Sequence, residues 1–245
     1  GMTMYGEMGF TKEGKIVGLD AKVIADAGAY PAIGGFLTFF TQTMIQGVYD
    51  IPKVRFHAQS ATTNTTQTAA YRGAGRPEAT QLLERLMDVA ADELDLDPAE
   101  IRFKNFIPEE AFPITTLGGA NYDSGDYSLA LNKALDEANY QSLLAEQQMR
   151  REQNSVVQLG IGIAAYVEIT APTGLQSEYG AVEVNEDGTV TARVGTSAHG
   201  QGHVTAFSML ISDLLGIEMD KITILQSDTD EISRGIGTMG SRSLQ

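Results

Sequence analysis

Three loops of this sequence combine glycine with hydrogen-bond donors, and they are the places where the chain could bind an anion. They are residues 71–76 (YRGAGR), 199–203 (HGQGH) and 235–243 (GIGTMGSRS). Glycine lets backbone N–H groups turn toward a ligand, and hydroxyl and guanidinium groups match the oxygens of a phosphate ester. Because acidic residues outnumber basic ones by 32 to 17, an anion must be held by local contacts.

The composition narrows the classes of protein that the chain can belong to. Its 245 residues, 42% of them hydrophobic, are enough for one large or two ordinary folded domains. The net charge of −15 argues against a nucleic acid or an anionic membrane surface as partner. Zero cysteines exclude a disulfide, a thiolate nucleophile and a cysteine-held iron–sulfur cluster in this chain. No apolar run approaches a membrane span, and we expect a cytoplasmic protein without a membrane segment.

Other residues suggest competing chemistries. His199 and His203 are four residues apart, a spacing that could hold zinc on a helix, but the glycines between them favour a loop. Asp228 and Asp230 could act as paired carboxylates or bind a hard cation, whereas the simpler interpretation is a turn that uses its own side chains. These motifs therefore leave a metal site open without favouring one.

A hydrolase is a further alternative, with Ser241, His203 and Asp228 as its catalytic triad. Such an enzyme would use the serine as nucleophile and the histidine as its base. The sequence has no nucleophile elbow of the G-x-S-x-G form. The hydrolase remains an alternative that requires these three side chains to converge.

Hydrophobic periodicity and turn residues predict mixed strands and helices, hence an α+β fold of two domains. The irregular stretch 108–125 suggests a boundary, giving domains 1–112 and 113–245. In the first domain we expect a hairpin of strands 4–10 and 15–26, a strand 54–63, a helix 77–95 and a short helix 98–106 that Asp97 caps. In the second we expect helices 127–138 and 141–153, strand 157–169, hairpin 178–195, helix 203–215 and strand 221–226.

The three loops together resemble the molybdenum-binding large subunit of the xanthine dehydrogenase and aldehyde oxidase family of molybdenum hydroxylases. AYRGAGRPEA resembles the family's arginine–glycine loop beside the molybdenum, GQGHVT its pterin-binding glutamine loop, and QSDTD followed by GIGTMGSRS its nucleotide-binding loop. The flanking stretches FTKEGKIVGLDAKVIADAGAY and AEIRFKNFI extend the match over essentially the whole chain. The resemblance implies two mixed α/β domains of the molybdenum cofactor-binding type, incomplete at both ends.

The resemblance assigns roles to residues of all three loops. It implies that Arg72 and Gly73 lie next to the metal, that Gln201 hydrogen-bonds the cofactor, and that the third loop holds the pyrophosphate and cytosine of a dinucleotide form. Arg76 is a further possible contact. The cofactor-binding residues implied are Arg72, Gly73, Gly200, Gln201, Gly202, His203, Gly240, Ser241, Arg242 and Ser243.

The resemblance also implies a molybdopterin cofactor whose pterin holds the molybdenum, so that no side chain here binds the metal directly. Family members oxidise a carbon centre, such as that of an aldehyde or an N-heterocycle, with an oxygen derived from water, and pass electrons to iron–sulfur clusters and commonly FAD. Those clusters and the flavin are expected on partner domains or subunits. The remaining partners expected are the rest of the large subunit and a small-molecule substrate.

Two family motifs are missing from this sequence: an upstream glycine–phenylalanine–glycine loop and a downstream Gly-x-Gly-Glu segment bearing the glutamate base. We therefore expect a fragment that is inactive alone, contains no catalytic residue and has its glutamate base beyond Gln245. The alternative is a non-catalytic binding or assembly module with the same fold. One subgroup oxidises carbon monoxide with copper on a cysteine of the arginine loop, and Gly73 stands in that place.

Overall fold

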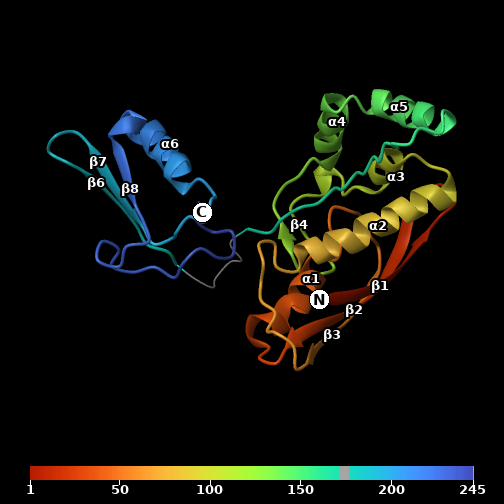
Figure 1. The fold of residues 1–245 in the computed structure, drawn as a ribbon, viewed down its shortest axis with the longest axis horizontal. Helices are drawn as coiled ribbons and strands as arrows, with labels where there is room; N and C mark the ends of the chain where they lie inside the picture. The colour runs from red at the N-terminus through yellow and green to blue at the C-terminus, as the bar shows by residue number, and fades with distance from the viewer. Residues whose placement is uncertain (171–176, 245) are drawn as a thin grey trace. The chain divides into compact units, whose positions relative to one another are not determined.

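The computed structural model describes residues 1–170 and 177–244 and divides into two compact units, Gly1–Glu168 and Ile169–Gln245 (Figure 1). Both units mix helices and strands, so the predicted α+β class is confirmed. These units are defined by contacts within the structure. The boundary between residues 112 and 113 that the sequence suggests stays a prediction. In the described part of the chain, no helix is long and apolar enough to cross a membrane.

The first unit is built on a three-stranded sheet in the order β1-β2-β3, with strands β1 (Met2–Phe10), β2 (Ile16–Gly28) and β3 (Val54–Thr62). β1 and β2 form the predicted antiparallel hairpin, while β3 pairs in parallel with β2. A parallel pairing requires a crossover, and here it runs through a short 3-10 helix, Ala32–Phe36, and α1 (Leu37–Thr43). α1 is not among the helices that the sequence predicts.

Two helices cover the core of this unit. α2 (Arg76–Leu94) packs against β1 so closely that a Cβ on Gly6 would lie 2.9 Å from Leu82 and Leu86. α3 (Pro98–Asn105) begins at Asp97, whose carboxylate accepts hydrogen bonds from the amides of Ala99 and Glu100, as predicted for its cap. Figure 1 shows α2 lying along the sheet.

The rest of the first unit contains a small hairpin and two further helices, α4 (Tyr127–Glu137) and α5 (Tyr140–Glu152). The hairpin consists of β4 (Ile114–Thr115) and β5 (Asn121–Tyr122) and lies in the stretch expected to be irregular. The predicted strand 157–169 is wrong, because the structure has no strand there. Every second residue from Ile161 to Val167 is apolar and packs against the core of the unit. An extended segment of this kind has the same period-two pattern as a strand, although it pairs with no other strand among the described residues.

The second unit repeats the plan of the first on a smaller scale. β6 (Gly180–Val184) and β7 (Val190–Val194) form the predicted antiparallel hairpin, and β8 (Ile222–Leu225) pairs in parallel with β7. The crossover contains α6 (His203–Leu215) and a 3-10 turn, Met219–Lys221. A short core of Val190, Ala192, Ile211 and Ile222 joins the helix to the sheet.

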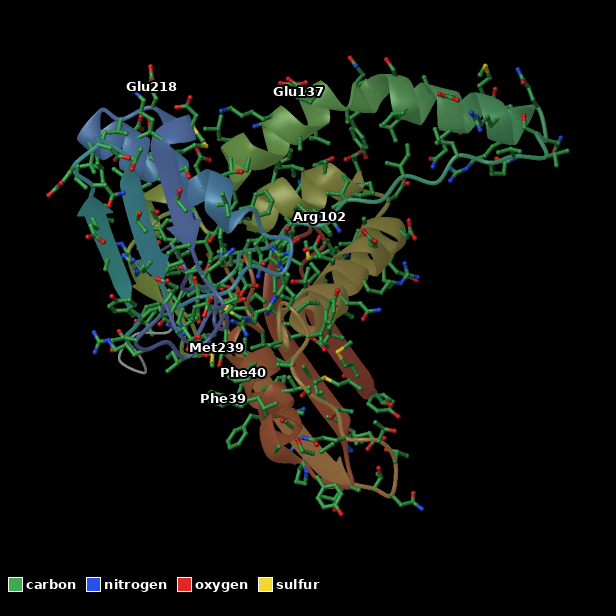
Figure 2. The ribbon with its side chains drawn as sticks, turned by 60° about the vertical axis from the view of Figure 1, so that its left-hand side comes forward. Phe39, Phe40, Arg102, Glu137, Glu218 and Met239 are labelled. Carbon is green, nitrogen blue, oxygen red and sulfur yellow. The ribbon has the colours of Figure 1, made fainter. Side chains whose placement is uncertain are left out.

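A buried ion pair connects the helices of the first unit. The Arg102 side chain on α3 is fully buried (Figure 2), and its Nε donates to the Glu84 carboxylate on α2 at 2.9 Å. Its Nη2 donates to Asp88 and to the backbone carbonyl of Ile163, both at 2.8 Å. Burial by itself would lower the pKa of Arg102, but attraction by Glu84 and Tyr49 together with the hydrogen bonds to Asp88 and Glu84 outweighs burial, and the pKa is raised. The guanidinium therefore stays charged and joins three separate segments.

We predict that Arg102→Met lowers the free energy of unfolding of this chain by about 3–5 kcal/mol, because it leaves the Glu84 carboxylate buried without its partner. Equilibrium urea unfolding followed by circular dichroism measures the loss. Lys104→Met is the matched control on the same helix, since Lys104 forms only an exposed pair with Glu100 and should cost much less. Equal losses in the two variants would contradict the role given to Arg102.

Candidate functional site

The arginine–glycine loop of the first unit leads into α2 with an unusual backbone. Gly73, Ala74 and Gly75 have φ angles of 106°, 41° and 89°, in the region that side chains disfavour. A Cβ on Gly75 would lie 2.7 Å from the carbonyl oxygen of Leu37, and one on Gly73 would lie 2.6 Å from Cγ of Pro77. Glycine is therefore required at both positions by conformation and by space.

The two arginines of this loop have different surroundings. Arg76 donates from Nε to Glu168 at 2.9 Å and from Nη1 to the carbonyl of Ala74 at 2.9 Å, and its guanidinium lies 5.7 Å from the ring centroid of Phe40. Arg72 is exposed and forms no ion pair with any residue that the structure describes. The charge of Arg76 is thus compensated internally, and Arg72 is the cation that the loop presents to its surroundings.

The second unit brings the other two loops together. The amide of Ser197 donates to Oγ1 of Thr238 at 2.8 Å, and the Thr238 hydroxyl donates back to the Ser197 carbonyl. The amide of Ala198 donates to the Gln226 side chain at 3.1 Å, which adds the segment after β8. Segments about forty residues apart in sequence therefore form one surface within this unit.

Glu178, which precedes β6, links these loops, although it is not among the site residues that the sequence predicts. Its carboxylate accepts from Arg242 Nη2 at 2.7 Å and from the amides of Tyr179 at 2.9 Å and Ile236 at 3.4 Å. Burial raises its pKa, but these hydrogen bonds and the charge of Arg242 outweigh burial, and the pKa is lowered. The only sequence signal was an acidic residue facing Gly195 across the predicted hairpin.

Backbone amides are the most abundant unused donors of these loops. Gly202 caps the N-terminus of α6 without a side-chain hydrogen bond, as expected for the start of the predicted helix. For the amides of residues 200–204 and 240–243, the described part of the chain provides no acceptor. These groups and the positive end of the α6 dipole favour an anion.

Side chains of the predicted site occupy varied positions in the same unit. The side-chain oxygen Oε1 of Gln201 accepts from the backbone amide of His199 in its own loop, while Ser241 is exposed and Ser243 half-buried. His203 is 7% exposed and packs on Phe207, with 5.2 Å between ring centroids. Nδ1 of His203 and Oγ1 of Thr196 are buried and have no hydrogen-bond partner among the described residues. The loop is thus short of partners for its polar groups.

The competing chemistries gain no support from this geometry. Among the described residues, no group of three histidine, aspartate or glutamate side chains could hold a metal ion. Asp228 accepts from the amide of Asp230 at 2.9 Å, which confirms the turn interpretation. Ser241, His203 and Asp228 are not joined by any hydrogen bond within residues 1–170 and 177–244, so the triad that a hydrolase requires is not assembled there.

Comparison with known proteins identifies the class of domain. Models of the molybdopterin cofactor-binding domain match residues 1–106 and 133–245. The carbon monoxide dehydrogenase large chain of Hydrogenophaga pseudoflava is 39% identical over 254 residues, an alignment that covers 98% of this chain and 32% of the relative. The chain therefore consists of molybdopterin cofactor-binding domains.

Solved structures agree with this assignment. A Cu,Mo-CO dehydrogenase matches with a TM-score of 0.84 and 34% identity, over 99% of this chain and 33% of that chain. Quinoline 2-oxidoreductase from Pseudomonas putida 86 matches with a TM-score of 0.88 and 26% identity, over 98% and 32%. The chain belongs to the xanthine dehydrogenase and aldehyde oxidase family of molybdenum hydroxylases, as its loops indicated, and spans about a third of the length of these relatives.

The described residues fit a phosphorylated pterin cofactor. Such a group is a polyanion with many hydrogen-bond acceptors, and the loops of the second unit offer unused amides at residues 200–204 and 240–243. The buried, unpartnered atoms of Thr196 and His203 lie in the same unit. Direct metal binding by cysteine is excluded for this chain, and the pterin would hold the metal instead.

The backbone geometry of the arginine–glycine loop predicts that replacing its glycine at position 73 destabilises the chain. We expect Gly73→Ala to lower the free energy of unfolding more than Gly119→Ala, because both glycines have positive φ but only Gly73 would place its Cβ against Pro77. The left-handed backbone costs roughly 1–2 kcal/mol in each variant, and the contact adds about 1–3 kcal/mol for Gly73. Thermal and urea unfolding measure both. Equal losses would show that the loop moves away from Pro77 at no cost.

Proposed function

We propose that this chain lines part of the molybdopterin site of a molybdenum hydroxylase and that the cofactor is the cytosine dinucleotide form. The observation that carries the proposal is the joined pair of loops in the second unit, whose amides have no acceptor among the described residues. Domain matches over residues 1–106 and 133–245 support a molybdopterin cofactor. The carbon monoxide dehydrogenase relative is consistent with the dinucleotide.

Each loop has a distinct part in this proposal. Amides at residues 240–243 and the hydroxyls of Ser241 and Ser243 bind the pyrophosphate and the cytosine. Gly200, Gln201 and Gly202, with the N-terminus of α6, bind the pterin and its phosphate. The buried His203 ring, which packs on Phe207, offers beside them its Nδ1, an atom without a partner among the described residues. Arg72 and the amide of Gly73 would bind the pterin or the oxo groups at the metal-bearing end of the cofactor.

The bound cofactor supplies oxidation of a carbon centre with oxygen derived from water. The residues of this chain hold and orient that cofactor, and Arg72 provides positive charge where the oxygen ligands carry negative charge. The proton acceptor would be a glutamate of the remaining large subunit, in a role typically worth about 10²–10⁴ in rate. We propose iron–sulfur and flavin subunits as the electron-accepting partners, and an aldehyde or an N-heterocycle as the substrate.

Copper-assisted oxidation of carbon monoxide is not part of this proposal. A copper-binding cysteine would replace Gly73, where the φ of 106° and the nearby Pro77 oppose any side chain. The likeness to carbon monoxide dehydrogenases therefore supports the fold and the cofactor rather than that substrate.

The test is to express the complete large subunit with its partner subunits and measure bound molybdenum together with CMP released by acid hydrolysis. We expect roughly equal amounts of both, because one dinucleotide cofactor carries one metal. A fully assembled complex that contains neither would refute the proposal, and molybdenum without CMP would refute the dinucleotide form alone.

In the same complex, we predict that Arg72→Met lowers kcat by about 10²-fold with little change in molybdenum content, since the loop keeps its glycines but loses its exposed cation. Arg85→Met is the matched control, because Arg85 is exposed on α2 and likewise forms no ion pair with the described residues. Equal activities of the two variants would contradict a role for Arg72 at the metal.

A further inference from the structure

We propose that Glu178 is a positioning residue of the cofactor site, and that Arg242 acts through its ion pair with Glu178 rather than as a ligand of the cofactor phosphate. Resting on the proposed function, this inference reverses the role that the sequence suggests for Arg242. The third loop then presents backbone amides and serine hydroxyls to the anion, while its guanidinium faces the protein.

The first line of argument is the direction and burial of the Arg242 side chain. Its Nη2 donates to Glu178 and to the carbonyl of Gly237, both at 2.7 Å, and the side chain is only 9% exposed. Its Nε is buried and has no partner among the described residues. The side chain is therefore mostly buried and the charge of its guanidinium is compensated by Glu178, which weakens its attraction for a phosphate outside the loop.

The second line of argument is what Glu178 joins together. Besides Arg242, its carboxylate accepts the amides of Tyr179 and Ile236, so it connects the start of β6 with the third loop. The backbones approach closely at the same point, because a Cβ on Gly235 would lie 2.5 Å from the carbonyl oxygen of Gly195. Loosening Glu178 therefore affects both loops that the cofactor would contact.

The third line of argument is a matching arrangement in the first unit. There Arg76, also in a glycine-rich loop, donates to Glu168 at 2.9 Å and to the carbonyl of Ala74 at 2.9 Å. Each arginine thus pairs with one carboxylate and one carbonyl of its own loop. An arginine held in this way braces a loop that contains several left-handed residues.

The experiment uses the complete large subunit in its complex and compares Glu178→Gln, Arg242→Met and the double variant. Hydrogen exchange reports the hydrogen-bonded amides of residues 195–199 and 234–238, and CMP content reports the cofactor. We expect each single variant to speed exchange in both segments about tenfold, the size expected for losing a hydrogen bond to a charged group. The double variant should be no faster than the faster of the two single variants, because each of them already removes the ion pair between Glu178 and Arg242.

Arg193→Met is the matched control, since Arg193 pairs with Glu183 and Glu231 in the same unit but lies outside the loops. It should leave exchange in both segments and CMP content unchanged. The inference also requires CMP loss of similar size in Glu178→Gln and Arg242→Met. It is overturned if Arg242→Met loses CMP while exchange stays at the wild-type rate, or if the two single effects on exchange multiply in the double variant.

Hydrogen exchange also shows whether a negative result concerns the positioning role or the proposed function. If the wild-type complex contains molybdenum but no CMP, the dinucleotide proposal fails, while exchange in the two segments still decides whether Glu178 and Arg242 brace the loops. If the complex contains CMP but exchange is the same in all variants, the proposed function stands and the positioning role is refuted.

Discussion

The buried ion pair between Arg102 and Glu84 is the interaction on which the first unit depends. It joins α3 to α2, and its bonds to the Ile163 carbonyl and from the Ala165 amide fasten the extended segment that leads out of the unit. α2 begins directly after the arginine–glycine loop, so the helix that carries Glu84 also sets the direction of that loop. Such a network is costly if incomplete, and here each charge has a close partner.

The two units share one architectural plan, an antiparallel hairpin followed by a helical crossover and a parallel third strand. The glycine-rich loops occupy different positions in this plan. In the second unit the glycine-rich loop leads into the crossover helix α6, whereas in the first unit it follows β3 and leads into α2. In both, glycines stand where a helix begins, a place where several backbone amides have no partner within the helix.

The distribution of charge explains how an acidic chain can hold an anionic cofactor. The arginines at 76 and 242 are neutralised by Glu168 and Glu178 within their own units, so they shape loops instead of adding to the field. In the site that we propose, binding relies on amides and hydroxyls, whose hydrogen bonds act at short range and are independent of the net charge of −15. Arg72 is exposed and forms no ion pair with the described residues, so its charge is the one that the arginine–glycine loop leaves uncompensated.

The sequence by itself determined the α+β class, the β1–β2 and β6–β7 hairpins, helices α2 to α6 and the three glycine-rich loops. These follow from local periodicity, capping residues such as Asp97 and turn chemistry. It could not distinguish the extended segment 157–169 from a strand, since both bury alternate side chains. Only the tertiary structure decided that Glu178 meets Arg242 and that Arg102 meets Glu84. The physical reason is that pairing of charges distant in sequence depends on which elements pack together, and a pattern along one segment carries no record of that.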